Sequence, residues 1–233
     1  MVSDQTGSPT GWSRAPLDPQ DLERTRLQRA LAWPLPSLLI SVESTFQAAA
    51  ELARSGAPEG STVVAEEQTA GRGRQGRSWS SPRGAGLWLT VIVDLVPAQR
   101  SLLPLAAGLA VRQVVAQLLP VSTQALGTQV ALVKWPNDVV VADGTQVRKI
   151  AGVLVEVVRD RCLVGIGLNV SLTQQELPPG LLATSLRESG GADTARAEIL
   201  IDLLMALRAC LGQLREDPSV LLAQYRMVSA SLG

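Results

Sequence analysis

The chain has 233 residues, of which 46% are hydrophobic and 18% charged, so we expect one or two globular domains. This composition excludes a disordered chain, a coiled coil and a collagen-like repeat. The 21 Lys and Arg residues balance the 21 Asp and Glu residues, which argues against a general polyanion-binding surface. No histidine occurs, which excludes Ser-His-Asp and Cys-His catalysis and any His-ligated metal site.

The cysteines and the N-terminus indicate the compartment. Cys162 and Cys210 lie far apart in apolar contexts, so we expect small buried side chains rather than a disulfide framework. The first residues lack the apolar segment of a signal peptide, and the uncharged stretch over residues 113–133 is too polar for a membrane span. We therefore expect a soluble, cytoplasmic protein without membrane association.

Helix and strand patterns divide the chain into an N-terminal extension, residues 1–36, and a larger unit, residues 37–233. The extension holds one short amphipathic helix within residues 17–32. Beyond it we expect strands at 38–42, 61–66, 87–95, 131–135, 139–142, 145–158 and 161–170, and helices at 44–55, 102–119, 194–215 and 219–227. Because no regular βαβ alternation occurs, the prediction is an α/β domain of the α+β type, with a mixed, largely antiparallel central sheet flanked by helices.

The loop over residues 68–86 contains a Gly-x-Gly-x-x-Gly pattern at residues 71–76. A dinucleotide fingerprint would need a helix beginning at the third glycine, and the following Arg-Ser-Trp-Ser-Ser-Pro cannot start one. We interpret the segment as a flexible loop in which Arg72, Arg74 and Arg77 offer forked donors for phosphate oxygens. Taken alone, it could equally be a solvated surface loop.

The dipeptide Asp143-Gly144 predicts a type I′ turn between two strands. A two-residue turn there places Val147 opposite Val140 and Lys149 opposite Asp138. The sequence thus predicts a Lys–Asp pair at the open end of a hairpin. Such a pair is either a structural cross-strand ion pair or a cation that holds a reacting anion beside a carboxylate.

Five motifs, in chain order, resemble those of the biotin–protein ligases, in the form that lacks an N-terminal DNA-binding domain. They are Glu43-Ser44-Thr45, the run from Glu67 to Trp79, Lys134-Trp135-Pro136-Asn137-Asp138, the run from Arg148 to Leu154, and the run from Gly165 to Val170. The resemblance extends over roughly residues 41–233.

The resemblance implies a biotin/lipoate protein ligase-like catalytic domain. It implies that biotin is activated with MgATP to biotinoyl-5'-AMP and that the biotinoyl group then passes to one lysine of a biotin carboxyl carrier domain of an acyl-CoA carboxylase. ATP, Mg²⁺ and biotin would be bound, without a fixed protein metal site. We expect no DNA partner and a monomer or weak homodimer.

The resemblance also implies site residues. Biotin would be bound by Ser44, Thr45, Gln68, Gly71, Arg72, Arg74, Lys149, Gly152, Leu154, Gly165 and Gly167, the last glycines letting strand backbone close around the ring. ATP and the adenylate would be bound by Arg72, Arg74, Arg77, Trp79, Lys134, Asn137 and Asn169. The catalytic residues would be Lys149, Asp138 and Arg77, with Lys149 between the biotin carboxylate and the α-phosphate and Asp138 beside the acceptor amine.

The sequence departs from the family at two places. Phe46 stands where Asn or Asp commonly follows Ser-Thr. The chain ends at Gly233 where relatives commonly continue into a small β-barrel, so we expect either that this chain is a shortened form or that the protein lacks the barrel. Three other functions stay open: a lipoate or octanoate ligase or transferase, a non-catalytic biotin-binding module, and an RNA-binding module that uses the arginines. One Phe and one Tyr supply few stacking platforms for RNA.

Overall fold

A computed structural model describes residues 12–120, 129–144 and 146–231. Its strands are β1 (Ser37–Leu39), β2 (Thr62–Ala65), β3 (Gly86–Val93), β4 (Val130–Lys134), β5 (Asp138–Ala142), β6 (Val147–Val158) and β7 (Arg161–Asn169). Its α-helices are α1 (Pro19–Gln28), α2 (Thr45–Arg54), α3 (Leu103–Leu118), α4 (Arg196–Glu216) and α5 (Pro218–Met227), and two short 3-10 helices are η1 (Arg74–Gly76) and η2 (Pro97–Leu102).

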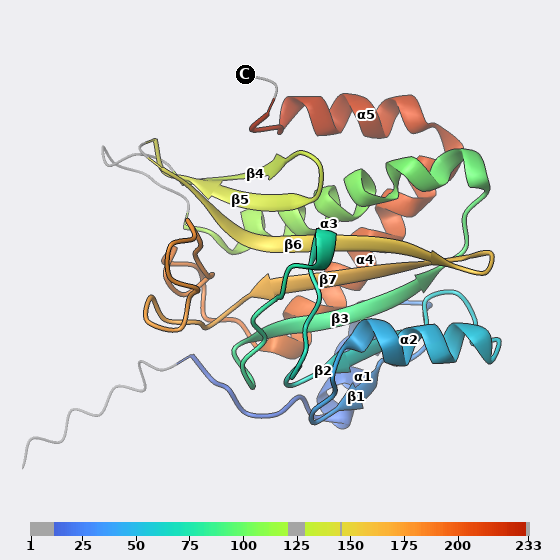
Figure 1. The fold of residues 1–233 in the computed structure, drawn as a ribbon, viewed down its shortest axis with the longest axis horizontal. Helices are drawn as coiled ribbons and strands as arrows, with labels where there is room; N and C mark the ends of the chain where they lie inside the picture. The colour runs from blue at the N-terminus through green and yellow to red at the C-terminus, as the bar shows by residue number, and fades with distance from the viewer. Residues whose placement is uncertain (1–11, 121–128, 145, 232–233) are drawn as a thin grey trace, which may run out of the picture.

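The strands form one seven-stranded sheet in the order β1-β2-β3-β7-β6-β5-β4 (Figure 1). Only β1 and β2 are parallel; each of the other neighbouring pairs is antiparallel. Consecutive strands β4 to β7 lie side by side, as short connections favour. The predicted mixed, largely antiparallel sheet flanked by helices is therefore confirmed.

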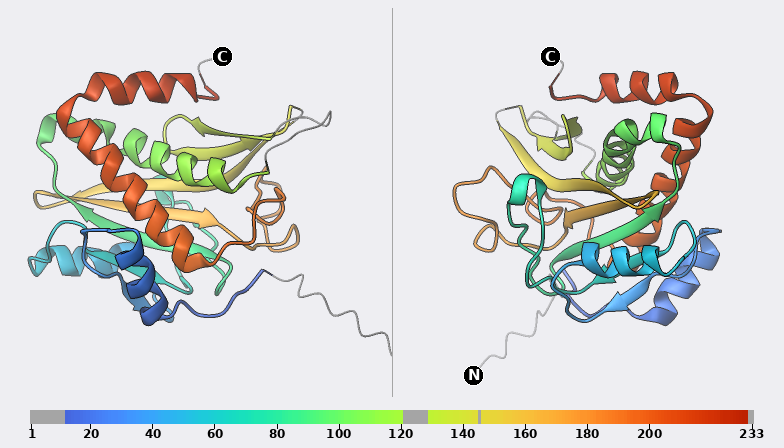
Figure 2. Two further views of the ribbon diagram at one scale, coloured as in Figure 1. Left: turned by 180° about the vertical axis from the view of Figure 1, so that it is seen from behind. Right: turned by 45° about the vertical axis from the view of Figure 1, so that its right-hand side comes forward.

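Helices cover the sheet on both faces (Figure 2). The odd-numbered residues of β3 from Leu87 to Val93 share one apolar core with α3 and α4, and Ile92 points into a smaller cluster with α2. This division follows from the period of two in a strand, which sends alternate side chains to opposite faces. β3 is buried along its whole length, which explains its continuous apolar run.

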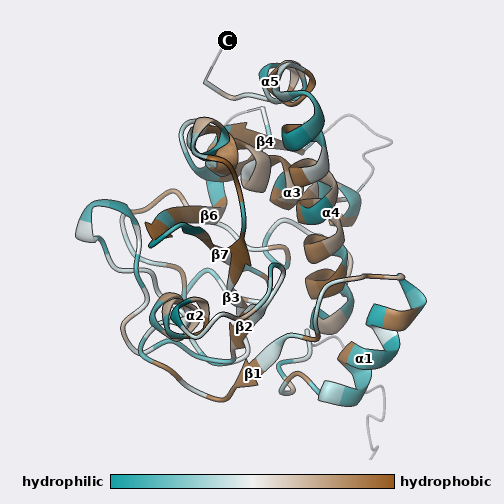
Figure 3. Cartoon of the chain, turned by 90° about the vertical axis from the view of Figure 1, so that its right-hand side faces the viewer, coloured by the Kyte–Doolittle hydropathy of each residue, from teal (hydrophilic) through white to brown (hydrophobic). Residues whose placement is uncertain are grey.

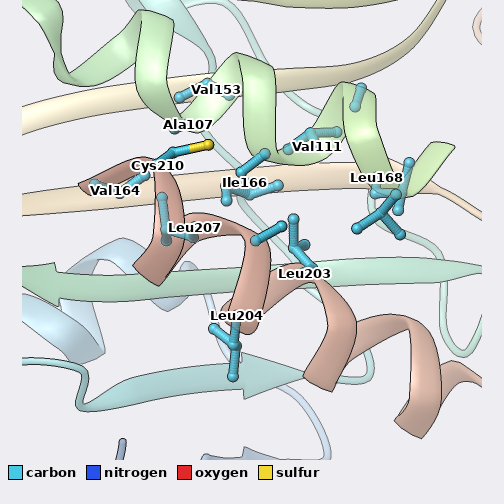
Figure 4. Packing of buried hydrophobic residues seen from close by; sticks show 14 of the residues in the cluster. Ala107, Val111, Val153, Val164, Ile166, Leu168, Leu203, Leu204, Leu207 and Cys210 are labelled. Atoms are coloured by element: carbon cyan, nitrogen blue, oxygen red, sulfur yellow. The ribbon is translucent and has the colours of Figure 1, made fainter. Parts of the chain in front are cut away.

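The larger core is built from small and branched side chains. Figure 4 shows Ala107 and Val111 of α3 and Leu203 and Leu207 of α4 facing the β-strand residues Val164, Ile166 and Leu168. Figure 3 shows the same division by hydropathy, with apolar surfaces of α3 and α4 turned inward and α1 largely hydrophilic. Pro97–Leu118 could cross a membrane by its length and apolar composition. Half of its most apolar 18-residue segment is buried inside the protein, however, as in a core helix.

The N-terminal segment packs on the same core. α1 contacts α4, and Leu22, Leu31 and Trp33 belong to the larger cluster. Asp18 caps α1 by accepting a hydrogen bond from Gln20 N at 2.7 Å. The division of the chain at residue 36 stays a prediction.

The predicted register of the β5–β6 hairpin is wrong. Val140, not Asp138, lies opposite Lys149, and the register shifts between Val139 and Val140. The reason lies in the connection, where Gln146 N donates to the Asp143 carboxylate at 2.9 Å and Asp143 N donates to Gln146 O at 3.2 Å. Ala142 therefore pairs with Val147, and the connection is centred one residue later than Asp143-Gly144 suggested.

Candidate active site

The loop between β2 and β3 folds back on itself. Within it, Trp79 N donates to Gly71 O at 2.8 Å and Gly73 N donates to Arg77 O at 2.7 Å. We call residues 71–79 the arginine loop; its tip is η1, where Gln75 and Gly76 have positive φ angles of 57° and 72°. Figure 1 shows this loop standing in front of the sheet with η1 before β6. As expected, no helix begins at Gly76; the short 3-10 helix η1 ends at this residue.

Beneath the loop lies a small pocket of about 60 Å³, which we call the inner pocket. Its lining comes from the start of α2, the arginine loop and the strands β3, β6 and β7. It includes the predicted residues Ser44, Thr45, Gln68, Arg72, Arg74, Trp79, Asn137, Lys149, Gly152, Leu154, Gly165 and Gly167. Gly71 is not part of this lining.

Gly71 has a different role in the loop. A Cβ on Gly71 would lie 2.4 Å from Trp79 O, so only glycine permits the close approach of the two sides of the loop. The residue therefore shapes the loop that covers the pocket rather than the pocket wall.

Polar side chains at the start of α2 are held in place by a hydrogen-bond cluster. Ser44 is the N-cap of α2, and its Oγ accepts from Phe46 N at 3.3 Å. Gln68 Oε1 accepts from Thr45 N at 2.9 Å and from Thr45 Oγ1 at 3.1 Å, and Gln68 Nε2 donates to Ser81 Oγ at 2.8 Å. Because these groups are already oriented, they can present fixed donors and acceptors to a polar ligand.

The strand glycines accommodate aromatic side chains. A Cβ on Gly167 would lie 2.5 Å from Trp79 Nε1 and Cε2, and one on Gly165 would lie 3.1 Å from Phe46 Cδ2. The indole of Trp79 thus lies directly on the backbone of β7, and its Nε1 is buried and finds no hydrogen-bond partner among the residues that the structure describes. Close approach to these glycines was predicted, but here the approaching groups are Trp79 and Phe46.

Lys149 and Asp138 do form the predicted pair, with Nζ and Oδ1 2.6 Å apart. They meet although the register differs, because Asp138 lies two residues before Val140 on the same face and a long side chain reaches a diagonal neighbour. Both side chains are about one-third exposed, at 33% and 27%. Lys149 Nζ also lies 5.0 Å from the centroid of the Trp79 ring, within cation–π range.

The three loop arginines point in different directions. Arg72 donates to Glu156 at 3.3 Å and lies 5.9 Å above the Phe46 ring. Arg74 donates to Asn137 Oδ1 at 3.1 Å, while Arg77 donates to Gln75 Oε1 within the loop at 3.3 Å. All three are exposed on the arginine loop.

Next to the inner pocket lies a larger hollow of about 500 Å³, the outer cavity. It is lined by Arg74, Arg77, Trp79, Lys134, Asn137, Asp138, Lys149, Asn169 and the loop residues 178 and 180–183, among others. Lys149 lines both hollows and so stands at their junction. Within residues 12–120, 129–144 and 146–231, no group of three or more His, Cys, Asp or Glu side chains could hold a metal ion.

Some lining residues were missed by the sequence analysis. Thr90 lines the inner pocket, and its Oγ1 lies 2.9 Å from Thr45 Oγ1. The sequence signal that could have identified Thr90 is that it is a lone polar residue in an apolar strand. Phe46 was noted only as a departure. Residues 180–183 were expected as loop with no role, and no local pattern predicts their position beside Lys149.

The chain is similar in sequence to proteins of one family. The sequence profile of the biotin/lipoate A/B protein ligase family matches residues 38–173. The chain is 37% identical over 224 residues to the biotin–acetyl-CoA-carboxylase ligase of Mycobacterium tuberculosis, covering 94% of this chain and 80% of that protein. It is 35% identical to the bifunctional ligase/repressor BirA of Bacillus subtilis, covering 70% of this chain but 50% of that protein.

Solved structures show the same fold. The biotin protein ligase of Leishmania major in complex with biotinyl-5-AMP superposes with a TM-score of 0.65 at 27% identity, over 83% of this chain and 81% of that one. The biotin protein ligase of Aquifex aeolicus in complex with biotin and ATP gives 0.62 at 33% identity, over 78% and 72%. The chain therefore belongs to the biotin/lipoate A/B protein ligase family.

Proposed function

We propose that this protein is a biotin–protein ligase. It joins biotin and ATP to biotinoyl-5'-AMP and then transfers the biotinoyl group to a lysine of a carrier domain. The observation that carries the proposal is the position of Lys149, which stands between a small, partly polar pocket and a larger cavity lined by basic side chains. The ligands named for the Leishmania and Aquifex relatives support the same two substrates.

In this proposal biotin occupies the inner pocket. Ser44, Thr45 and Gln68 contact the ureido ring, while Leu154 and the glycines Gly152, Gly165 and Gly167 border its apolar body. Small-molecule sites usually enclose about 300–1,000 Å³, and the inner pocket holds only about 60 Å³. The arginine loop and Trp79 must therefore withdraw to admit biotin and close over it afterwards.

The first step forms a bond between a biotin carboxylate oxygen and the α-phosphorus of ATP, and the bond from that phosphorus to pyrophosphate breaks. Two anions must approach, so fixed positive charge lowers the barrier. Lys149 holds the carboxylate and the α-phosphate together, while Arg72, Arg74, Arg77 and Lys134 bind phosphate oxygens. Mg²⁺ enters with ATP and neutralises charge on its phosphates.

The nucleotide occupies the outer cavity, with Trp79, Asn137 and Asn169 toward its adenosine end. The closed arginine loop then keeps water from the mixed anhydride. In the second step the neutral amine of the acceptor lysine attacks the acyl carbon and AMP leaves. Asp138 accepts the proton that the amine gives up.

The acceptor would be the biotin carboxyl carrier domain of an acyl-CoA carboxylase, as the name of the Mycobacterium relative suggests. We further propose that the protein acts in the cytoplasm as a monomer or weak homodimer and does not bind DNA. The formal net charge of zero supports the last point.

The decisive experiment incubates the protein with biotin, MgATP and a carrier domain and reads the mass of the carrier. A gain of one biotinoyl group, dependent on ATP and accompanied by pyrophosphate release, is expected. Lipoate and octanoate serve as competing substrates in the same assay. A carrier modified by lipoate but not by biotin would refute the proposal, and biotin binding without pyrophosphate release would indicate a non-catalytic module.

A further inference from the structure

The N-terminal segment before α1 makes a specific contact with a distant loop. Arg14 Nη1 donates to Glu176 Oε1 at 2.7 Å and Nη2 donates to Oε2 at 2.7 Å, a bidentate ion pair. Arg14 also donates to Ser171 twice, from Nε to Oγ at 3.1 Å and from Nη2 to the carbonyl oxygen at 2.8 Å. One guanidinium thus fixes both ends of the turn over residues 171–176.

A buried ion pair holds the backbone next to Arg14 in place. Arg196 and Glu66 form an ion pair at 2.7 Å whose side chains are only 4% and 7% exposed. Arg196 also donates to Ala15 O at 2.6 Å, and Glu66 accepts from Leu17 N at 2.7 Å. Because this buried pair binds the backbone on either side of residue 16, the Arg14 side chain starts from a fixed point of the core.

Glu176 connects Arg14 to the loop that begins at Thr173. Its Oε2 also accepts from Thr173 N and Thr173 Oγ1, both at 2.9 Å, which closes the turn. The hydrogen bonds from Arg14 lower the pKa of Glu176 to about 2, so the carboxylate is charged at neutral pH. Among the residues that follow, Pro178 and residues 180–183 form part of the wall of the outer cavity.

The same loop continues to the proposed catalytic lysine. Lys149 N donates to Leu182 O at 2.7 Å, and Thr184 N donates to Lys149 O at 2.8 Å. Asn169 Nδ2 donates to Thr184 O at 2.9 Å and secures this strand-like contact. At Lys149, one edge of β6 therefore pairs with β5 and the other with residues 182–184.

We propose that Arg14 is a positioning residue for the nucleotide subsite, which acts through Glu176 to hold the loop 173–184 against Lys149. This inference rests on the proposed function, since it takes the outer cavity as the ATP site. Arg14 does not line that cavity, so its effect is on the geometry of the wall rather than on substrate. The contact between Arg14 and Glu176, which are distant in the sequence, thereby contributes to adenylation by holding the wall of the ATP site in place.

The test compares Arg14→Ala with wild type in the full chain, by pyrophosphate release at varied ATP and by biotin calorimetry without ATP. We expect the KM for ATP to rise about three- to tenfold, the range for losing a charged hydrogen-bond pair whose side chains are about one-third exposed. The biotin Kd should stay unchanged. Arg14→Lys, which keeps the charge but not the fork, should recover part of the loss.

Glu176→Gln should also raise the KM for ATP, and the double variant should be no worse than Arg14→Ala, because Arg14→Ala already removes the ion pair with Glu176 together with both hydrogen bonds to Ser171. The matched control is Arg24→Ala, which breaks an exposed Arg–Asp pair of 2.8 Å on α1 that does not reach the loop. It should leave the KM for ATP unchanged.

Two results would overturn the inference: an unchanged KM for ATP in Arg14→Ala, or an equal fall in kcat and biotin affinity, as from general loss of structure. If wild type itself releases no pyrophosphate, the proposed function fails instead. Hydrogen exchange of residues 173–184 then decides the inference: faster exchange in Arg14→Ala than in wild type and Arg24→Ala supports the positioning, and equal exchange refutes it.

Discussion

Replacing Gly167 by Ala tests whether the contact between Trp79 and β7 shapes the closed pocket. The added Cβ would lie 2.5 Å from Trp79 Cε2 and Nε1, whereas carbon atoms pack at about 3.5–4.0 Å. β7 is held between β3 and β6, so the strand cannot retreat and the indole must move by roughly 1 Å or more.

Overpacking of this kind costs about 1–3 kcal/mol. Because Trp79 comes from a loop, the cost falls on the closed state of the arginine loop rather than on the core. If biotin is held only when the loop is closed, its apparent Kd rises in proportion, by roughly five- to 140-fold at about 1.4 kcal/mol per factor of ten.

Isothermal calorimetry with biotin and thermal unfolding measure the two effects separately. We expect much weaker binding with a small change in Tm. Gly108→Ala in α3 is the control, since its Cβ would meet only Val133 Cγ1 at 3.8 Å. Wild-type biotin affinity in Gly167→Ala would refute the reasoning, because it would mean that the position of Trp79 over β7 has no bearing on the pocket.

Three further predictions follow from the site and its support. Lys149→Ala should lower pyrophosphate release by about 10²–10³-fold while biotin binding stays measurable, and wild-type release would contradict the role given to Lys149. Arg74→Gly removes the hydrogen bond from the loop tip to Asn137 and should speed the loss of bound adenylate about tenfold. An unchanged rate of loss would contradict a role of Arg74 in retaining the adenylate. The folded-state pKa of Glu176, about 2, lies below its unfolded value of about 4.3, so the stability it contributes is present above the unfolded value and lost as pH falls toward 2. The difference in Tm between wild type and Glu176→Gln should therefore be largest near pH 6–7 and shrink below about pH 4, and a pH-independent difference would argue against the ion pair.

Much of the fold could be predicted from the sequence because its signals are local. The pattern over residues 44–55 predicted the helix α2, and the apolar run over residues 87–95 predicted the buried strand β3. These signals depend on hydrogen bonds and side-chain spacing within a few residues, so they do not need the rest of the chain.

The site was predicted as a set of residues, mostly through resemblance, and its spatial arrangement was not. The Lys149–Asp138 pair was expected from a register that is wrong, and it forms because a register shift and a long side chain compensate. Local patterns did not predict that Trp79 would lie on Gly167, nor that Arg72 would turn to Glu156.

The sequence by itself determined the types of the elements, the order of the motifs and the chemistry their side chains can perform. Tertiary structure alone decided which of those side chains meet. Arg14 and Glu176 are 162 residues apart in the sequence. Residues 182–184 form hydrogen bonds with Lys149 although no local sequence pattern predicts that they meet. Such contacts are set by how the sheet and helices pack as a whole, because each is a small free-energy term that the nearest residues in sequence do not encode.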